Sequence, residues 1–71
     1  MENDARALAQ HLAALNSTVE GVYLVWGGGD MEEAIATFQK AQKFSPAIDL
    51  NPYTEEIETD PEAVARQLAE E

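Results

Sequence analysis

Seventy-one residues are enough for one small domain, and 14 Asp and Glu against 4 Lys and Arg leave it a formal net charge of −10. This charge argues against nucleic acid or an anionic membrane as a partner, because both require clustered cations. The chain lacks cysteine, which excludes disulfides and thiolate sites, and its longest apolar run cannot span a bilayer, so we expect a soluble, cytoplasmic protein.

The first predicted element is a helix over residues 1–16. Asn3 or Asp4 is suited to cap its start, and apolar residues recur on one face at Ala5, Leu8, Leu12 and Leu15. Asn16 then interrupts the pattern, and Ser17 followed by Glu20 forms the pattern of a capping box. We therefore expect the first helix to end at residue 16 and a second helix to begin just after it.

The next segment, residues 19–26, is ambiguous from the sequence. Its β-branched and aromatic residues favour a strand, and Gly21 weakens a helix by about 1 kcal/mol. A single strand, however, leaves its backbone unpaired in a chain whose other segments are helical. We predict a helix that ends in the glycines at 27–29, and the alternative is a strand paired with another chain.

The best-defined helix lies between Gly29 and Pro46. Asp30 can cap its first turn, Glu33 can complete a capping box, and the proline ends it. Its apolar residues recur at three- and four-residue spacing and so share one face, at Met31, Ala34, Ile35, Phe38, Ala41 and Phe44.

This segment resembles the second helix of a tetratricopeptide repeat. The residues that match the family pattern are Gly29 in the turn, the small residues Ala34 and Ala41, the aromatic Phe38 and the terminating Pro46. Upstream, Gly21 and Leu24 match first-helix positions, whereas Ser17 and Glu20 stand near positions where the family has Trp and Leu. The resemblance implies a helix-turn-helix hairpin over residues 17–46 that binds proteins or peptides without catalysis.

The last part of the chain is predicted to be a loop followed by a helix. Residues 47–60 have no apolar period and include Pro52, which is typical of a loop. Asp60 and Pro61 supply a cap and a first helical residue for a helix over residues 61–71. Val64 and Leu68 are its only large apolar residues, so we expect it to dock weakly. The predicted fold class is therefore a small all-α domain spanning residues 1–71.

Catalytic and metal-binding patterns are weak. His11 is the only histidine and has no acidic residue one turn away, and the glycine run at 27–29 lacks the Lys and Ser or Thr of a phosphate loop. Residues 49–60 match the length of a calcium loop, but Tyr53 and Thr54 replace a ligand and the turning glycine. We expect no catalytic residue, no cofactor and no metal, and we do not expect an enzyme.

The predicted function is protein–protein interaction. Tyr23 and Trp26 are the candidate partner-binding residues, because aromatic side chains commonly anchor interfaces, unless Leu8, Leu12 and Leu15 of the first helix cover them. The acidic charge favours a basic or apolar protein or peptide. Two alternatives are a homo-oligomeric structural module and a binding domain engineered or selected on a repeat scaffold, since residues 17–28 depart most from the family pattern.

Overall fold

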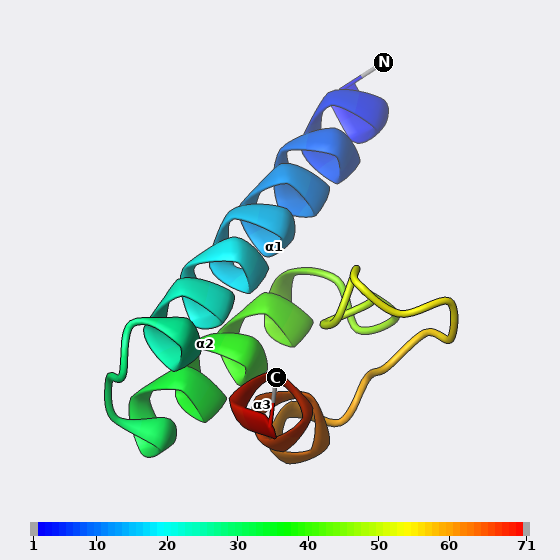
Figure 1. Cartoon of the computed structure of the whole chain (residues 1–71). Helices are drawn as coiled ribbons and strands as arrows, with labels where there is room; N and C mark the ends of the chain where they lie inside the picture. Colours follow the sequence, from blue (N-terminus) through cyan, green and yellow to red (C-terminus); the bar gives the residue numbers. More distant parts are fainter. Residues whose placement is uncertain (1, 71) are drawn as a thin grey trace.

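Three helices make up the computed structural model, which describes residues 2–70: α1 (Glu2–Trp26), α2 (Met31–Phe44) and α3 (Pro61–Glu70). No strand occurs in that range, which confirms the predicted all-α class. Helices α1 and α2 lie side by side as a hairpin, and α3 packs against both (Figure 1). Residues 19–26 belong to α1, so the helix predicted for this segment is confirmed.

Helix α1 is continuous through Asn16 and Ser17, so the predicted break at this point is wrong. Asn and Ser each cost a helix interior only a few tenths of a kcal/mol relative to alanine, which packing against α2 overrides. The neighbouring Thr18 is buried, and its hydroxyl donates a hydrogen bond to the carbonyl of Ala14 at 2.9 Å. The predicted capping is also wrong at the start, since α1 begins at Glu2 and its first turn contains Asn3 and Asp4.

The three glycines after α1 form an ordered turn. Gly29 N–H donates to the Leu24 carbonyl at 2.9 Å and Gly28 N–H donates to the Val25 carbonyl at 3.2 Å, which together make a Schellman motif. Gly28 has a φ of 74°, a left-handed conformation that glycine adopts at little steric cost. This turn reverses the chain and sets α2 against α1.

Both ends of α2 lie where the sequence predicts them. The Asp30 side chain accepts a hydrogen bond from Glu32 N–H at 3.0 Å and caps the first turn. The helix ends at Phe44, and Ser45 is extended with φ −147° and ψ 96°, as a residue before proline requires.

The core lies where α2 meets α1 and α3. Phe38 is fully buried at its centre, flanked by the fully buried Ala34 and Ala41. Gly21 of α1 faces the Phe38 ring so closely that a Cβ atom there would lie 2.6 Å from it. The remaining buried apolar residues are Ala14, Val22, Val25, Ile48, Leu50, Val64, Ala65 and Leu68.

Residues 45–60 form a loop, as predicted, but one with its own hydrogen-bond network. The Asp49 carboxylate accepts from the backbone N–H groups of Asn51 and Glu58 at 3.0 and 3.1 Å. Leu50 N–H donates to the Glu58 carbonyl at 2.8 Å, which closes the loop across its base. Leu50 itself enters the core, so the loop contributes to folding and not only to connection.

Helix α3 begins at the predicted Pro61, with Asp60 accepting from Glu62 N–H at 3.2 Å as its cap. The expectation of weak docking is wrong, because Val64 and Leu68 are fully buried and Ala65 between them allows close approach. The buried Asn51 side chain also donates to Gln67 at 3.0 Å and ties the loop to this helix.

Candidate interaction surface

A continuous line of large apolar side chains lies exposed along α1. We call it the α1 stripe, and its members are between 40% and 69% exposed: Leu8, Leu12, Leu15, Val19, Tyr23 and Trp26. At about 100° of rotation per residue, they fall within roughly 80° of one another around the helix axis. Exposed apolar residues scattered over a surface are normal, whereas a contiguous line of them is typical of interaction surfaces.

The opposite side of α1 carries the contacts that hold the hairpin together. Ala14, Thr18, Gly21 and Val25 are all buried there, and most of them are small, so the backbone of α2 approaches closely. Helix α1 therefore has two apolar faces. One face packs inside the domain, and the other, the α1 stripe, is exposed.

The N-terminal half of α1 extends beyond the rest of the domain (Figure 1). Every residue from 4 to 12 is exposed, and the molecule measures 42 × 23 × 14 Å along its principal axes. Leu8 and Leu12 of the stripe therefore lie on a segment without helical neighbours. The expectation that the first leucines fold back over residues 22–26 is wrong, because α1 is one continuous rod.

Tyr23 and Trp26, the two candidate binding residues, lie on the same side of α1 near its C-terminal end, and both are exposed. Trp26 also contacts Tyr53 of the loop, with ring centroids 5.1 Å apart and an interplanar angle of 47°. Beside this pair is a hollow of about 480 Å³ whose wall includes Val25 and Leu68. Sequence reasoning missed Tyr53, because it lies in a segment without periodicity.

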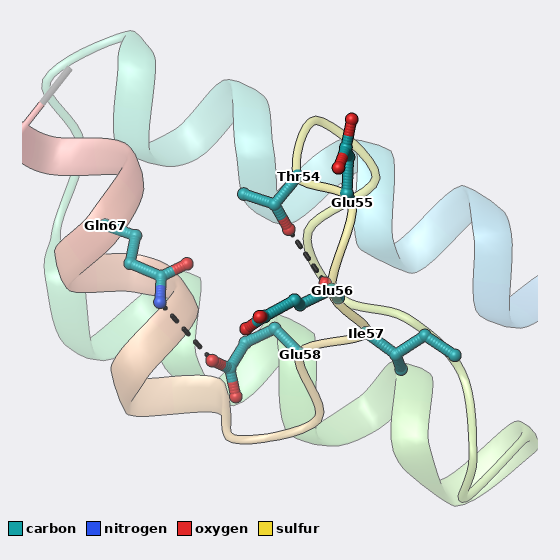
Figure 2. A pocket seen from close by; sticks show the side chains of 6 residues that line it. All are labelled: Thr54, Glu55, Glu56, Ile57, Glu58 and Gln67. Atoms are coloured by element: carbon teal, nitrogen blue, oxygen red, sulfur yellow. Dashed lines mark hydrogen bonds between the residues drawn. The ribbon is translucent and has the colours of Figure 1, made fainter.

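A second hollow, of about 420 Å³, lies between the loop and α3 and is lined by Thr54, Glu55, Glu56, Ile57, Glu58 and Gln67 (Figure 2). Its polar groups bond to one another: Gln67 donates to the Glu58 carboxylate at 3.3 Å, and the Thr54 hydroxyl donates to the Glu56 carbonyl at 2.8 Å. The Gln67–Glu58 contact joins the loop to α3, and the Thr54–Glu56 contact lies within the loop. Its described lining includes no histidine and no basic side chain.

In the calcium-loop pattern at 49–60, the aspartates accept hydrogen bonds from backbone N–H groups. Asp49 accepts two loop N–H groups and Asp60 caps α3, so both carboxylates have structural partners. Within residues 2–70, no group of three or more His, Cys, Asp or Glu side chains is placed to hold a metal ion. Over the same range, no helix is both long and apolar enough to cross a bilayer.

The residues of the repeat pattern occupy structural positions. Gly21, Ala34, Phe38 and Ala41 are buried between the helices. Leu24 is half-buried, Gly29 lies in the turn, and the exposed Pro46 follows α2. They build the hairpin and leave the α1 stripe free. Searches with protein-family models, among curated proteins and among solved structures found no match to this chain.

Proposed function

We propose that this protein is a non-catalytic protein–protein interaction module and that the α1 stripe is its binding surface. The observation that carries the proposal is the exposure of six aligned large apolar side chains on a helix whose other face already packs in the core. Leaving such a line in water is unfavourable by about 25 cal/mol for each Å² of apolar surface, so a partner that covers it gains this free energy.

The resemblance of the hairpin to a single, divergent tetratricopeptide repeat supports the same proposal. Repeats of that family present helical surfaces to peptides or to neighbouring repeats, and one repeat normally needs others to cover its exposed faces. We propose a partner whose surface is apolar, or basic and attracted by the acidic domain. We also propose the cytoplasm as the location, which the lack of cysteine supports.

A capture experiment with matched variants tests this function. The parent chain, a Leu12→Gln/Leu15→Gln variant and an Ile57→Gln control are immobilised, and each is presented with a cell extract and, separately, with a tagged copy of the chain. Ile57 is 72% exposed but lies outside the stripe, which makes it a suitable control. Circular dichroism verifies that all three remain helical.

We expect the parent and Ile57→Gln to retain the same protein and the stripe variant to lose it. Retention that is equal for all three chains, or absent for all three, contradicts the proposed binding surface.

A further inference from the structure

The spacing of the α1 stripe is that of a seam between two helices. From Leu8 the steps to Leu12, Leu15 and Val19 are four, three and four residues, and seven more residues lead to Trp26. With Tyr23 four residues after Val19, the 18 residues from Leu8 to Trp26 make five steps that average 3.6 residues, the repeat of a straight α-helix, so these side chains stay on one face from end to end. The stripe is therefore shaped to receive another helix along its full length and not a compact ligand at one point.

The charge distribution favours this face of the chain as the place where a second copy could dock. Between Ala5 and Val19 the chain has no acidic residue, whereas 11 of the 14 acidic residues follow Gly29. The α1 stripe is thus the place where a second copy of this acidic chain meets the least repulsion. A parallel pair would set two acidic domains side by side, whereas an antiparallel pair places them at opposite ends of the seam.

We propose that the occupant of the α1 stripe is α1 of a second copy, paired antiparallel about a two-fold axis at the level of residue 17. This inference rests on the proposed function and names its partner. With that axis, Leu8 meets the partner's Trp26, and Leu15 meets the partner's Val19. The protruding half of each α1 then covers the C-terminal half of the other, and both receive a helical neighbour.

The area available is close to what a stable dimer requires. Counting about 150–250 Å² for a fully exposed aromatic side chain and somewhat less for an aliphatic one, the stripe exposes on the order of 600 Å² per chain. A standard interface buries about 800 Å² on each partner. The small residues beside the stripe, such as Ala5 and Ala9, and the ring of Tyr53 supply the remainder. The same patch meets itself, as a two-fold interface requires.

Sedimentation equilibrium over a range of concentrations tests the pairing. We expect the full chain to reach twice its mass of 7.8 kDa. Leu15→Glu at the centre of the seam should weaken dimerisation by at least about 100-fold, because it sets two carboxylates close together in an apolar contact. Ile57→Glu adds the same charge outside the seam and should leave dimerisation unchanged within about threefold.

Cysteine crosslinking tests the direction of the helices, since the chain has no cysteine of its own. In the antiparallel pair, Asn16→Cys lies beside its counterpart and should form a disulfide-linked dimer. Leu8→Cys lies far from its counterpart and should not, whereas in a parallel pair it crosslinks readily. Crosslinking at position 8 and not at 16 overturns the antiparallel arrangement.

A parent chain that stays monomeric up to about millimolar concentration, or a Leu15→Glu variant that dimerises like the parent, overturns this inference. The proposed function has a separate readout. Suppose that the parent captures a different protein, the Leu12→Gln/Leu15→Gln variant loses it, and the chain itself stays monomeric. The α1 stripe is then the binding surface, and the inference that its partner is a second copy is contradicted.

Discussion

Gly21 of α1 lies against the Phe38 ring of α2, and the pair shows how one residue without a side chain positions two helices. A Cβ atom on Gly21 would lie within 2.6–2.9 Å of three atoms of the Phe38 ring. The glycine lowers the helix propensity of α1, yet its absent side chain provides the space that the ring fills. The same residue weakens the helix locally and permits the packing that stabilises it.

Replacing Gly21 by alanine should therefore destabilise the protein. Alanine gains about 1 kcal/mol of helix propensity, but overpacking of a fully buried ring costs typically 1–3 kcal/mol. We expect a net loss measured by thermal and urea unfolding. In a Phe38→Leu background, where the ring is gone, the same replacement should cost less or stabilise. A Gly21→Ala variant of the otherwise unchanged chain that melts higher than the parent would show that the contact is not tight.

Truncating Phe38 to alanine should have the largest effect of any single core change. The side chain is fully buried, so its loss leaves a cavity that costs about 3–5 kcal/mol, a large part of the stability of so small a domain. Unfolding measured by circular dichroism should reveal a partly or wholly unfolded chain at room temperature. A midpoint within a degree or two of the parent would mean that α2 does not pack as described.

Trp26 should matter more for association than for folding. It is 48% exposed at the end of the α1 stripe, so Trp26→Ala should weaken partner binding or self-association by more than about 1 kcal/mol. Stability should fall less than for Phe38→Ala. Tyr53→Ala, which removes the ring in tilted contact with Trp26, should give a smaller loss of binding. Complete unfolding of Trp26→Ala, with tryptophan emission already blue-shifted in the dilute parent, would assign this residue to the core.

At the scale of elements, the sequence predicts the ends that are set by local chemistry. Asp30 and Pro46 delimit α2, and Asp60 with Pro61 starts α3, because caps and prolines act within one turn. The predicted break at Ser17 fails for a different reason. Its cost is a few tenths of a kcal/mol, and the packing that outweighs it comes from α2, which no local pattern contains.

The turn between α1 and α2 leads to a prediction about backbone strain at Gly28. Gly28 has a left-handed φ of 74° with open space around its Cα, so Gly28→Ala introduces backbone strain and no clash. We expect a loss of about 1 kcal/mol in urea unfolding. Gly28→Asn is the matched control, because asparagine tolerates this conformation and should retain most of the stability. Equal stability of the alanine variant and the parent would contradict the Schellman geometry.

The all-α class can be predicted from the sequence, and Tyr23 and Trp26 can be named as candidates, but the residues that surround them in the fold cannot be predicted. The Trp26–Tyr53 contact joins segments 27 positions apart, and the burial of Leu50 depends on a loop closed by Asp49 and Glu58. Neither has a periodic signal. The sequence favours core positions for the leucines of α1, because their spacing is the same whether the stripe packs within the chain or against another chain.

The net charge leads to a prediction about salt whose sign depends on the partner. Two copies that each carry −10 repel, so raising NaCl from about 0.05 to about 0.5 M should tighten the dimer as screening increases. A basic partner should instead associate more slowly over the same range. Sedimentation equilibrium measures the affinity of the dimer, and stopped-flow measurements give the association rate of a basic partner. A dimer that weakens steadily with salt would mean that ion pairs, and not the apolar seam, hold it together.

The protruding half of α1 has a further consequence. A short helical segment on its own is marginal in water, so residues 5–12, which extend beyond the other helices, depend on a docked partner for their stability as a helix. Docking then stabilises this part of the helix, so docking and helix formation are coupled. We therefore expect the helix content of the chain to rise as the α1 stripe becomes occupied, so that circular dichroism reports on docking.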